Sequence, residues 1–359
     1  MTAATGRLVR GVRRAPIFQS GTNAIATAGV GACVAYLAYR FVNWAVVHAI
    51  WTLPEGSSSA VCRAARGQGA CWAVVNERFR FILFGTYPFD DQWRPALVCL
   101  MFVSLYLVSA VRAWWRPALL GVWLAVPMSA VALLRGGFLG LADVQTDRWG
   151  GLPLTFVLST IGFAAAIPLA VALALGRRSR MPAISALCTA YIELVRGVPI
   201  ITFLFMAAVM FPLFVPQGVL VDKVLRAQIA IVMAVAAYLA EVVRAGLQAV
   251  PKGQYEAASS MGLRFWPATI VIVLPQALRA TIPSIVNTFI ATFKDTTLVT
   301  VIGLFDLLGI SKAVMVDPKW VGFGVEVYCF VGVVYFAFCY AVSQYSQRLE
   351  RMLTAERHH

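Results

Sequence analysis

The residues of this chain that could do chemistry are ionisable and polar side chains set inside long apolar stretches. They are Glu193, Arg196, Glu241, Asn287, Thr288, Lys294 and Asp295. An ionisable residue inside a membrane span is costly and by default marks a functional site. The acids could attract an ammonium group and the bases a carboxylate, so these side chains could line a path for a zwitterion. Gly197 and Pro199 would loosen the helix beside them, and broken helices often line substrate sites.

Internal pairing is a structural alternative for the same residues. Glu193 and Arg196 lie three positions apart, so they share a helix face and could pair with each other. Lys294 and Asp295 are adjacent and point to different faces, which makes a shared binding role less natural. Both explanations stay open at this point.

Patterns for catalysis and nucleotide binding are missing from the sequence. It contains no G-x-x-x-x-G-K-[ST] phosphate loop, so it does not bind ATP by that device. His48 is the only histidine away from the tail, and no Ser/His/Asp or Cys/His set is recognisable. The seven cysteines show neither a C-x-x-C pair nor zinc spacing. We therefore expect no enzyme activity, no metal site and no cofactor in this chain.

The composition is that of a polytopic helical membrane protein. Of the 359 residues 60% are hydrophobic and 13% are charged, against about 25% charged in soluble domains. Several apolar runs exceed the roughly 20 residues that cross a bilayer, and the short alternating segments of barrels are absent. The net charge of +14 comes from Lys and Arg clustered between apolar runs, as in cytoplasmic loops, so we do not expect nucleic acid binding.

Eight apolar segments are expected to span the membrane. They lie at residues 24–50, 95–111, 118–134, 152–175, 182–215, 225–248, 270–302 and 323–344. Pro199 and Pro212 should kink the fifth segment, and Pro275 and Pro283 should break the seventh. Basic clusters lie near the N-terminus, at 177–180 and at 348–351. An even count of spans and these clusters place both termini in the cytoplasm.

The spans divide into three parts. Residues 1–150 form an N-terminal extension of three helices, residues 151–348 form the core, and residues 349–359 form a cytoplasmic tail. Residues 53–93 read as a polar periplasmic loop and residues 303–322 as the last outer loop. Cys62 and Cys71 could form a disulfide in an oxidising periplasm, worth about 2.5 kcal/mol by the chain-entropy estimate. Free thiols are the alternative.

A short polar break at residues 251–267 should form a rigid helix-turn-helix at a membrane face. Pro251 and Gly253 should end the preceding helix, and residues 255–261 can form about two turns. Gly262 should act as a C-cap, and Pro267 fits the first turn of a second short helix. Ala257 and Ala258 are small enough for another surface to approach closely.

This break resembles a known loop. Glu256-Ala257-Ala258, then Gly262, Ile272 and Leu274-Pro275 at fixed spacing, resemble the EAA loop of ABC-importer permeases. We call residues 251–267 the EAA loop. The resemblance implies that this loop docks into a cleft on a separate ATPase and transmits its closure to the pore. The residues that would make this coupling contact are Glu256, Ala257, Ala258, Gly262, Leu263 and Arg264.

Four further segments resemble the polar amino acid branch of these permeases. They lie at residues 191–199, 237–244, 251–258 and 294–299. The three-helix extension is similar to the larger permease subunit of general L-amino-acid importers. The resemblance implies a type I permease core of five helices in the bacterial inner membrane, working by alternating access. It also implies a second, related permease subunit in a heterodimer, two subunits that bind ATP and Mg, and a periplasmic amino-acid-binding protein.

On this basis we hypothesise that Glu193 and Glu241 face the α-ammonium group of an amino acid. Arg196 or Lys294 would then face the carboxylate. An ion-coupled secondary transporter or channel is the alternative function, because such carriers also carry ionisable residues in mid-span. Carriers often have two repeated halves, and no convincing internal repeat is present here. Which amino acids are carried is left open.

Overall fold

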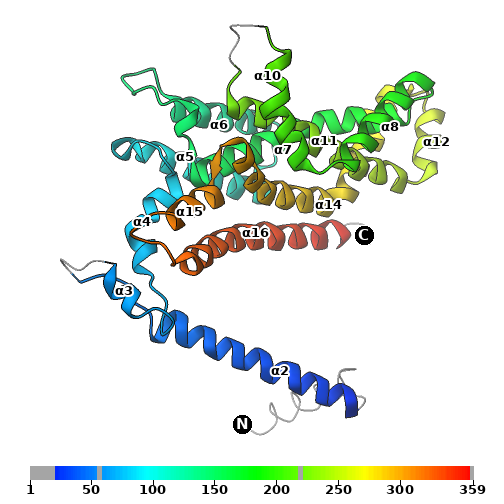
Figure 1. The fold of residues 1–359 in the computed structure, drawn as a ribbon. Coiled ribbons are helices and arrows are strands. Elements are labelled where there is room, and N and C mark those ends of the chain that lie inside the picture. Colours follow the sequence, from blue (N-terminus) through cyan, green and yellow to red (C-terminus); the bar gives the residue numbers. More distant parts are fainter. Residues whose placement is uncertain (1–20, 55–58, 217–220, 356–359) are drawn as a thin grey trace. The chain divides into compact units, whose positions relative to one another are not determined.

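Inside a bilayer every backbone N–H and C=O must be satisfied within the protein, so apolar segments fold as helices. The computed structural model describes residues 21–54, 59–216 and 221–355, and over these ranges the chain is almost entirely helical (Figure 1). Two compact units are present, Met1–Glu77 and Arg78–His359, and each is described by itself. The basic N-terminal flank and the last residues of the tail lie outside the described ranges.

The expected all-helical membrane fold is confirmed. Within the described ranges, seven helices are long and apolar enough to cross a membrane, and a bent pair of helices makes an eighth candidate. The seven are α2 with η2 (Gly21–Val47), η3 with α5 (Phe89–Ala110), α6 (Ala118–Arg135), α7 (Gly151–Arg177), α11 (Lys223–Ala249), the segment Phe265–Ile302 that includes α14 (Leu274–Asp295), and Gly324–Met352 within α16 (Gly324–Ala355).

The first unit holds the predicted disulfide. Cys62 on α3 (Ala60–Ala64) is bonded to Cys71, with their Cα atoms 5.8 Å apart. The Trp72 indole N–H donates to the Ala45 carbonyl at 2.6 Å and ties this loop to the end of the first span. The region 53–93 is not the plain polar loop that was expected, because α3, α4 (Ala73–Phe84) and η3 (Phe89–Asp91) occupy much of it.

In the second unit α5 and α6 pack together and against α7. Arg94 at the start of α5 is fully buried, and its guanidinium donates to the Tyr87 hydroxyl at 3.0 Å and the Ala142 carbonyl at 2.6 and 2.9 Å. The Tyr87 hydroxyl donates to the Leu134 carbonyl. Burial raises the pKa of Tyr87, while the nearby Arg94 guanidinium lowers it.

The two compact units divide after Glu77, whereas the sequence predicted a domain boundary at residue 150. That boundary stays a prediction.

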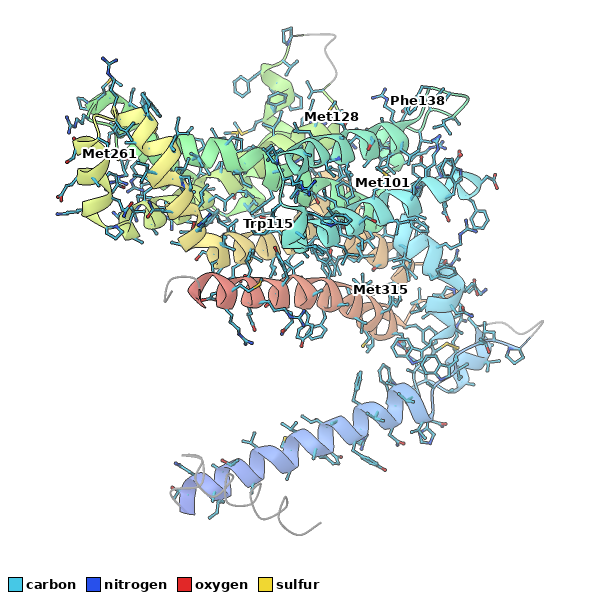
Figure 2. The ribbon with its side chains drawn as sticks, turned by 180° about the vertical axis from the view of Figure 1, so that it is seen from behind. Met101, Trp115, Met128, Phe138, Met261 and Met315 are labelled. Atoms are coloured by element: carbon cyan, nitrogen blue, oxygen red, sulfur yellow. A yellow bond between two sulfur atoms is a disulfide. The ribbon has the colours of Figure 1, made fainter. Side chains whose placement is uncertain are left out.

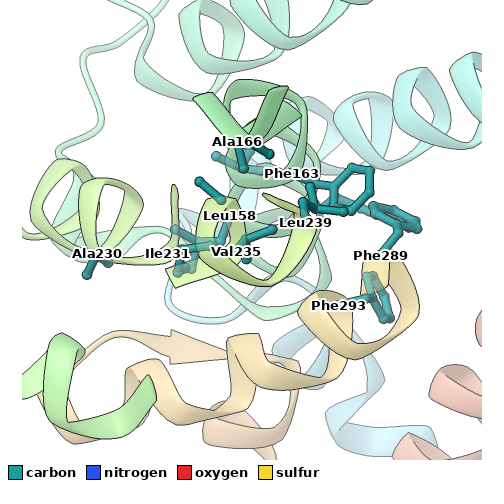
Figure 3. Packing of buried hydrophobic residues seen from close by; sticks show 14 of the residues in the cluster. Leu158, Phe163, Ala166, Ala230, Ile231, Val235, Leu239, Phe289 and Phe293 are labelled. Atoms are coloured by element: carbon teal, nitrogen blue, oxygen red, sulfur yellow. The ribbon is translucent and has the colours of Figure 1, made fainter. Parts of the chain in front are cut away.

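The core forms where α7, α11 and α14 lie side by side (Figure 1). A Cβ at Gly162 of α7 would meet the Ile231 side chain of α11 at 2.7 Å, so glycine permits the close crossing. Phe163 and Phe289 meet edge to face with ring centroids 5.1 Å apart (Figure 3). Small residues between helices and aromatic residues around them therefore fill the centre of the unit.

The fifth span is sharply broken. Helix α8 (Pro182–Gly197) and the segment Ile200–Phe214 meet at an angle of 100°. The latter contains α9 (Ile200–Phe205), the π-helical turn η6 (Met206–Met210) and α10 (Phe211–Phe214). The break falls at the predicted Pro199, whose ring cannot continue the hydrogen-bond ladder. Pro212 produces no second break, because the π turn directly precedes it.

Two other expectations were wrong. Pro275 and Pro283 do not break the seventh span, since Phe265–Ile302 is continuous, with Pro275 in the first turn of α14 and Pro283 inside it. A π-helical turn, η7 (Ala268–Val273), precedes Pro275 and accommodates its missing N–H. The helical segment also begins earlier than expected, with α13 at Phe265–Pro267.

Residues 303–322 are also more than a loop, since they contain strand β1 (Phe305–Asp306) and helix α15 (Leu307–Met315). Asp306 organises this region, with its carboxylate accepting from Gly309 N and the Tyr335 hydroxyl, both at 2.9 Å. Burial raises the pKa of Asp306 although both donors oppose the shift. Backbone bridges join β1 to Gly150 and Gly151, and so close the end of α7 that lies away from the EAA loop.

Arg226 supports the π turn in the fifth span. Pro212 has no N–H to offer the carbonyl of Ala208, four residues earlier, and Arg226 Nη1 donates to that oxygen at 2.6 Å. Arg226→Met should lower the thermal midpoint of the purified protein, because an unsatisfied acceptor costs about 1–3 kcal/mol.

The control is Pro212→Ala, which returns a backbone N–H near the same oxygen. In the Arg226→Met background it should recover part of the lost stability, as measured by scanning fluorimetry in detergent. If the two substitutions change the thermal stability additively, Arg226 and residue 212 do not act on the same Ala208 carbonyl, which would contradict this explanation.

Candidate functional site

The EAA loop forms the predicted helix-turn-helix. Helix α12 (Lys252–Ser260) follows Pro251, and Gly253 lies inside it instead of ending the previous helix. Gly262 adopts φ +75°, and its N–H donates to Ser259 O while Leu263 N donates to Ala258 O. These two bonds make a Schellman motif, which satisfies the last carbonyls of the helix and fixes the turn.

The two faces of α12 differ in exposure. Glu256 and Ala257 are exposed, whereas Ala258 is only 1% exposed and packs inside the chain. The expectation that Ala258 offers room to another surface was therefore wrong. Leu263 is half-buried, and Arg264 is exposed at the start of α13.

An apolar surface lies next to this exposed face. Met261, labelled in Figure 2, is 76% exposed just after α12. Phe265 and Trp266 of α13 are also exposed and meet edge to face, with ring centroids 5.4 Å apart. The EAA loop thus presents Glu256 and Ala257 beside three large apolar side chains, a combination suited to a protein partner.

Hydrogen bonds attach α12 to the ends of three spans. The Tyr255 hydroxyl donates to Leu247 O of α11 at 3.1 Å and accepts from Arg178 Nη1 at 3.3 Å. Arg178 also donates to Leu247 O, and Gln276 Nε2 of α14 donates to the Gln254 amide oxygen at 3.0 Å. A displacement of α12 is therefore carried to α7, α11 and α14 together.

A cluster of charged side chains lies next to this junction. We define the ion cluster as Arg177, Glu193, Arg196, Glu241 and Arg244. Arg177 pairs with Glu193 at 2.9 Å and with Glu241, and so joins α7, α8 and α11. Arg244 donates to Glu241 Oε2 at 2.8 and 2.9 Å, and Arg196 lies 3.8 Å from the same oxygen. Three arginines thus share the Glu241 carboxylate.

These contacts bear on the residues singled out in the sequence. Glu193, Arg196 and Glu241 are brought together as internal pairing would require, yet the expected Glu193–Arg196 pair is replaced by contacts to Arg177 and Glu241. The helical spacing fitted that pair, but the neighbouring helix α7 supplies a competing guanidinium. Arg177 was missed as a partner, although its place at the end of a span next to Arg178 could have indicated it.

The polar residues on α14 form a separate group. Ser284, Asn287 and Lys294, together with the small apolar residue Ala291, recur at a spacing of three and four residues and are all exposed. The side chains of Asn287 and Lys294 have no hydrogen bond or ion pair with any other residue that the structure describes. A polar stripe of this kind is costly against lipid, so this face needs water or a protein partner.

The remaining two predicted residues of α14 face other surroundings. The Thr288 hydroxyl donates to Ser284 O, one turn earlier, and Asp295 is half-buried. Lys294 and Asp295 therefore do not act as one exposed pair. Among the described residues no group of three or more His, Cys, Asp or Glu side chains could hold a metal ion.

Comparison with known proteins gives consistent matches. The family model of the binding-protein-dependent transport system inner membrane component matches residues 166–351. The chain is 43% identical to the inner membrane amino-acid ABC transporter permease protein YhdY of Escherichia coli (strain K12), over 96% of this chain and 93% of that protein. It is 38% identical to the glutamate/glutamine/aspartate/asparagine transport system permease protein BztC of Rhodobacter capsulatus, over 86% and 85% of the two chains.

One solved structure resembles the core. The crystal structure of an amino acid ABC transporter with histidines is 28% identical, with a TM-score of 0.50. The match covers 56% of this chain and 92% of the other one.

Glu241 should be the acid on which the ion cluster depends. Glu241→Gln removes the charge shared by three arginines, and we expect a loss on the order of 1–3 kcal/mol in unfolding experiments. Glu193→Gln is the matched control. Its side chain is 58% exposed and contacts one arginine, so its loss should be well below that of Glu241→Gln. Equal destabilisation by the two variants would contradict the central role of Glu241.

Proposed function

The chain belongs to the inner membrane components of binding-protein-dependent transport systems, and from this membership we propose a route by which it couples ATP hydrolysis to amino acid import. It is the permease component of an ABC amino acid importer, a multi-pass inner-membrane protein that is not itself catalytic. ATP is handled by the ATPase partner. The secondary transporter considered above is therefore set aside.

The first step of the route is docking of the EAA loop. The exposed Glu256–Ala257 face of α12 enters a cleft on the ATPase, with Leu263, Arg264 and the apolar surface of Met261, Phe265 and Trp266 beside it. Gly262 fixes the turn, and Ala258 packs the loop from inside. The observation that carries this proposal is the attachment of α12 to three spans through Tyr255, Arg178 and Gln276.

The second step is transmission through α7. Arg178 holds the EAA loop, and its neighbour Arg177 holds Glu193 of α8 and Glu241 of α11. When the ATPase pair closes and moves α12, the end of α7 moves with it. The ion cluster then carries that movement to the broken span α8–α9, whose 100° bend is a natural place for a change of angle.

The third step is passage of the amino acid along the exposed stripe of α14. Lys294, which makes no ion pair within the described residues, faces the α-carboxylate, with Asn287 as a further polar group of the stripe and half-buried Thr288 next to it. Glu193 serves the α-ammonium better than Glu241, because it is more exposed and holds one arginine instead of three. Arg196 and Asp295 take supporting roles. Groups common to all α-amino acids would be recognised in this way, which suits a broad substrate range.

The assembly follows from the same exposed surfaces. A second permease of related fold covers the α14 stripe from the other side, in a heterodimer, and two ATPase subunits receive the EAA loops. A periplasmic binding protein delivers the amino acid at the end of α7 that lies away from the EAA loop. Both termini of the chain are then cytoplasmic.

Ala257→Trp should uncouple the importer. The indole would keep α12 from seating in the cleft, so uptake per ATP hydrolysed should fall at least tenfold in proteoliposomes that contain the whole complex and its binding protein. Ala341→Trp on the exposed side of α16 is the matched control and should leave the ratio unchanged. A normal ratio in Ala257→Trp would contradict docking through this face.

Lys294→Gln should weaken uptake through the substrate step. A hydrogen bond to a charged group is worth about 1.5–3 kcal/mol, so the KM for uptake should rise about tenfold or more. Lys294→Arg should keep most of the affinity, and Lys312→Gln, at an exposed position of α15, is the control. An unchanged KM for Lys294→Gln, with binding-protein affinity checked separately by calorimetry, would exclude a contact between Lys294 and the carboxylate.

A further inference from the structure

The second unit contains a pocket that shares no lining residue with the α14 stripe or the ion cluster. It has a volume of about 370 Å³ and lies between α7, α11 and α14. Its walls are apolar and include Ile167, Leu239, Val243, Leu278 and Ile282. This volume falls within the range of roughly 300–1,000 Å³ that is typical of small-molecule sites.

Arg279 is the one charged residue among those that line the pocket. It is exposed, and it makes no hydrogen bond or ion pair with any other described residue. The other conspicuous arginines near this end of the helices, Arg177 and Arg244, are paired with Glu241. A guanidinium without a partner among the described residues, beside an apolar pocket, suits an amphipathic ligand that has an anionic group and an apolar part.

The depth of Arg279 follows from the packing of Gly246. A Cβ at Gly246 would meet Ala277 O at 2.5 Å and the Thr281 methyl at 2.7 Å, so these two residues lie level with it. Arg279 falls between them, close to the end of α11 at Ala249. Three residues of helix are about 4.5 Å, so Arg279 lies near the membrane surface on the side of the EAA loop. The pocket reaches from Pro275, on the EAA-loop side of Arg279, to Ile285, which lies farther toward the middle of the span.

The chemistry of the walls separates the possible ligands. A free amino acid would need an acceptor for its ammonium group, and none of the side chains that line the pocket is acidic or otherwise an acceptor. A phospholipid meets both features, because its phosphate is an anion at the membrane surface and its acyl chain is an apolar body below it. Basic pockets between spans are known to hold anionic lipid head groups in this way.

We propose that this pocket is a binding site for an anionic phospholipid. Its phosphate contacts Arg279, and one acyl chain fills the space between α7, α11 and α14. The proposal depends on the membrane location of the chain and not on the transport route above. Because the same three helices hold the EAA loop, the bound lipid would pack at the root of the segments that move.

The test compares variants by native mass spectrometry after purification of the importer from nanodiscs of equal phosphatidylglycerol and phosphatidylcholine. The wild type should retain phosphatidylglycerol in preference to phosphatidylcholine. Arg279→Gln should bind about fivefold less phosphatidylglycerol and lose the preference, as expected for one basic residue near the surface. Arg279→Lys should keep the preference, and Ile282→Trp should exclude both lipids by filling the pocket.

Arg351→Gln is the matched control, since Arg351 is also exposed and lies near the end of α16. A photo-crosslinking residue at position 282 identifies the occupant directly, and an adduct of lipid mass supports the proposal. Equal retention by Arg279→Gln and the wild type, an equal loss in Arg351→Gln, or a crosslink to protein at position 282 would each overturn it.

Discussion

Two consecutive arginines at the end of α7 tie the EAA loop of this permease to the helices α8 and α11. Arg178 binds the backbone of α11 and the hydroxyl of Tyr255, and Arg177 binds Glu193 and Glu241. Guanidinium groups suit this task because their five donors lie in a fixed plane and can serve two acceptors at once. The EAA loop, the ion cluster and helix α8 of the fifth span all contact this one helix end.

The charged groups of the second unit are gathered at the two ends of its spans. The ion cluster lies at the end near the EAA loop, whereas buried Arg94 and buried Asp306 lie at the opposite end, close to the start of α7. Packing between these levels is by small and aromatic side chains such as Gly162, Phe163 and Phe289. Directional contacts thus fix the helix ends, and close packing of small and aromatic side chains fills the apolar middle.

Much of the fold could be predicted because the bilayer imposes strong rules. Span number, the disulfide between Cys62 and Cys71, the break at Pro199 and the turn at Gly262 follow from apolar length, oxidising location and backbone chemistry. Pro275 was misjudged, because a proline removes one hydrogen bond without breaking a span when a π turn before it takes up the change. Pro283 was misjudged too, since α14 continues through it. Ala258 was misjudged because spacing in a short helix does not reveal which face is turned inward.

The candidate site was less predictable, since ion pairs depend on which helices become neighbours. Glu193 and Arg196 have the spacing of an ion pair on one helix. In the structure, however, Glu193 pairs with Arg177 of α7, and Arg196 lies near Glu241 of α11. Three arginines around one glutamate leave net positive charge, which is stabilised only where water or anions can approach. The cluster therefore belongs near a membrane surface. This agrees with the position of Glu241 and Arg244 about five to eight residues from the end of α11.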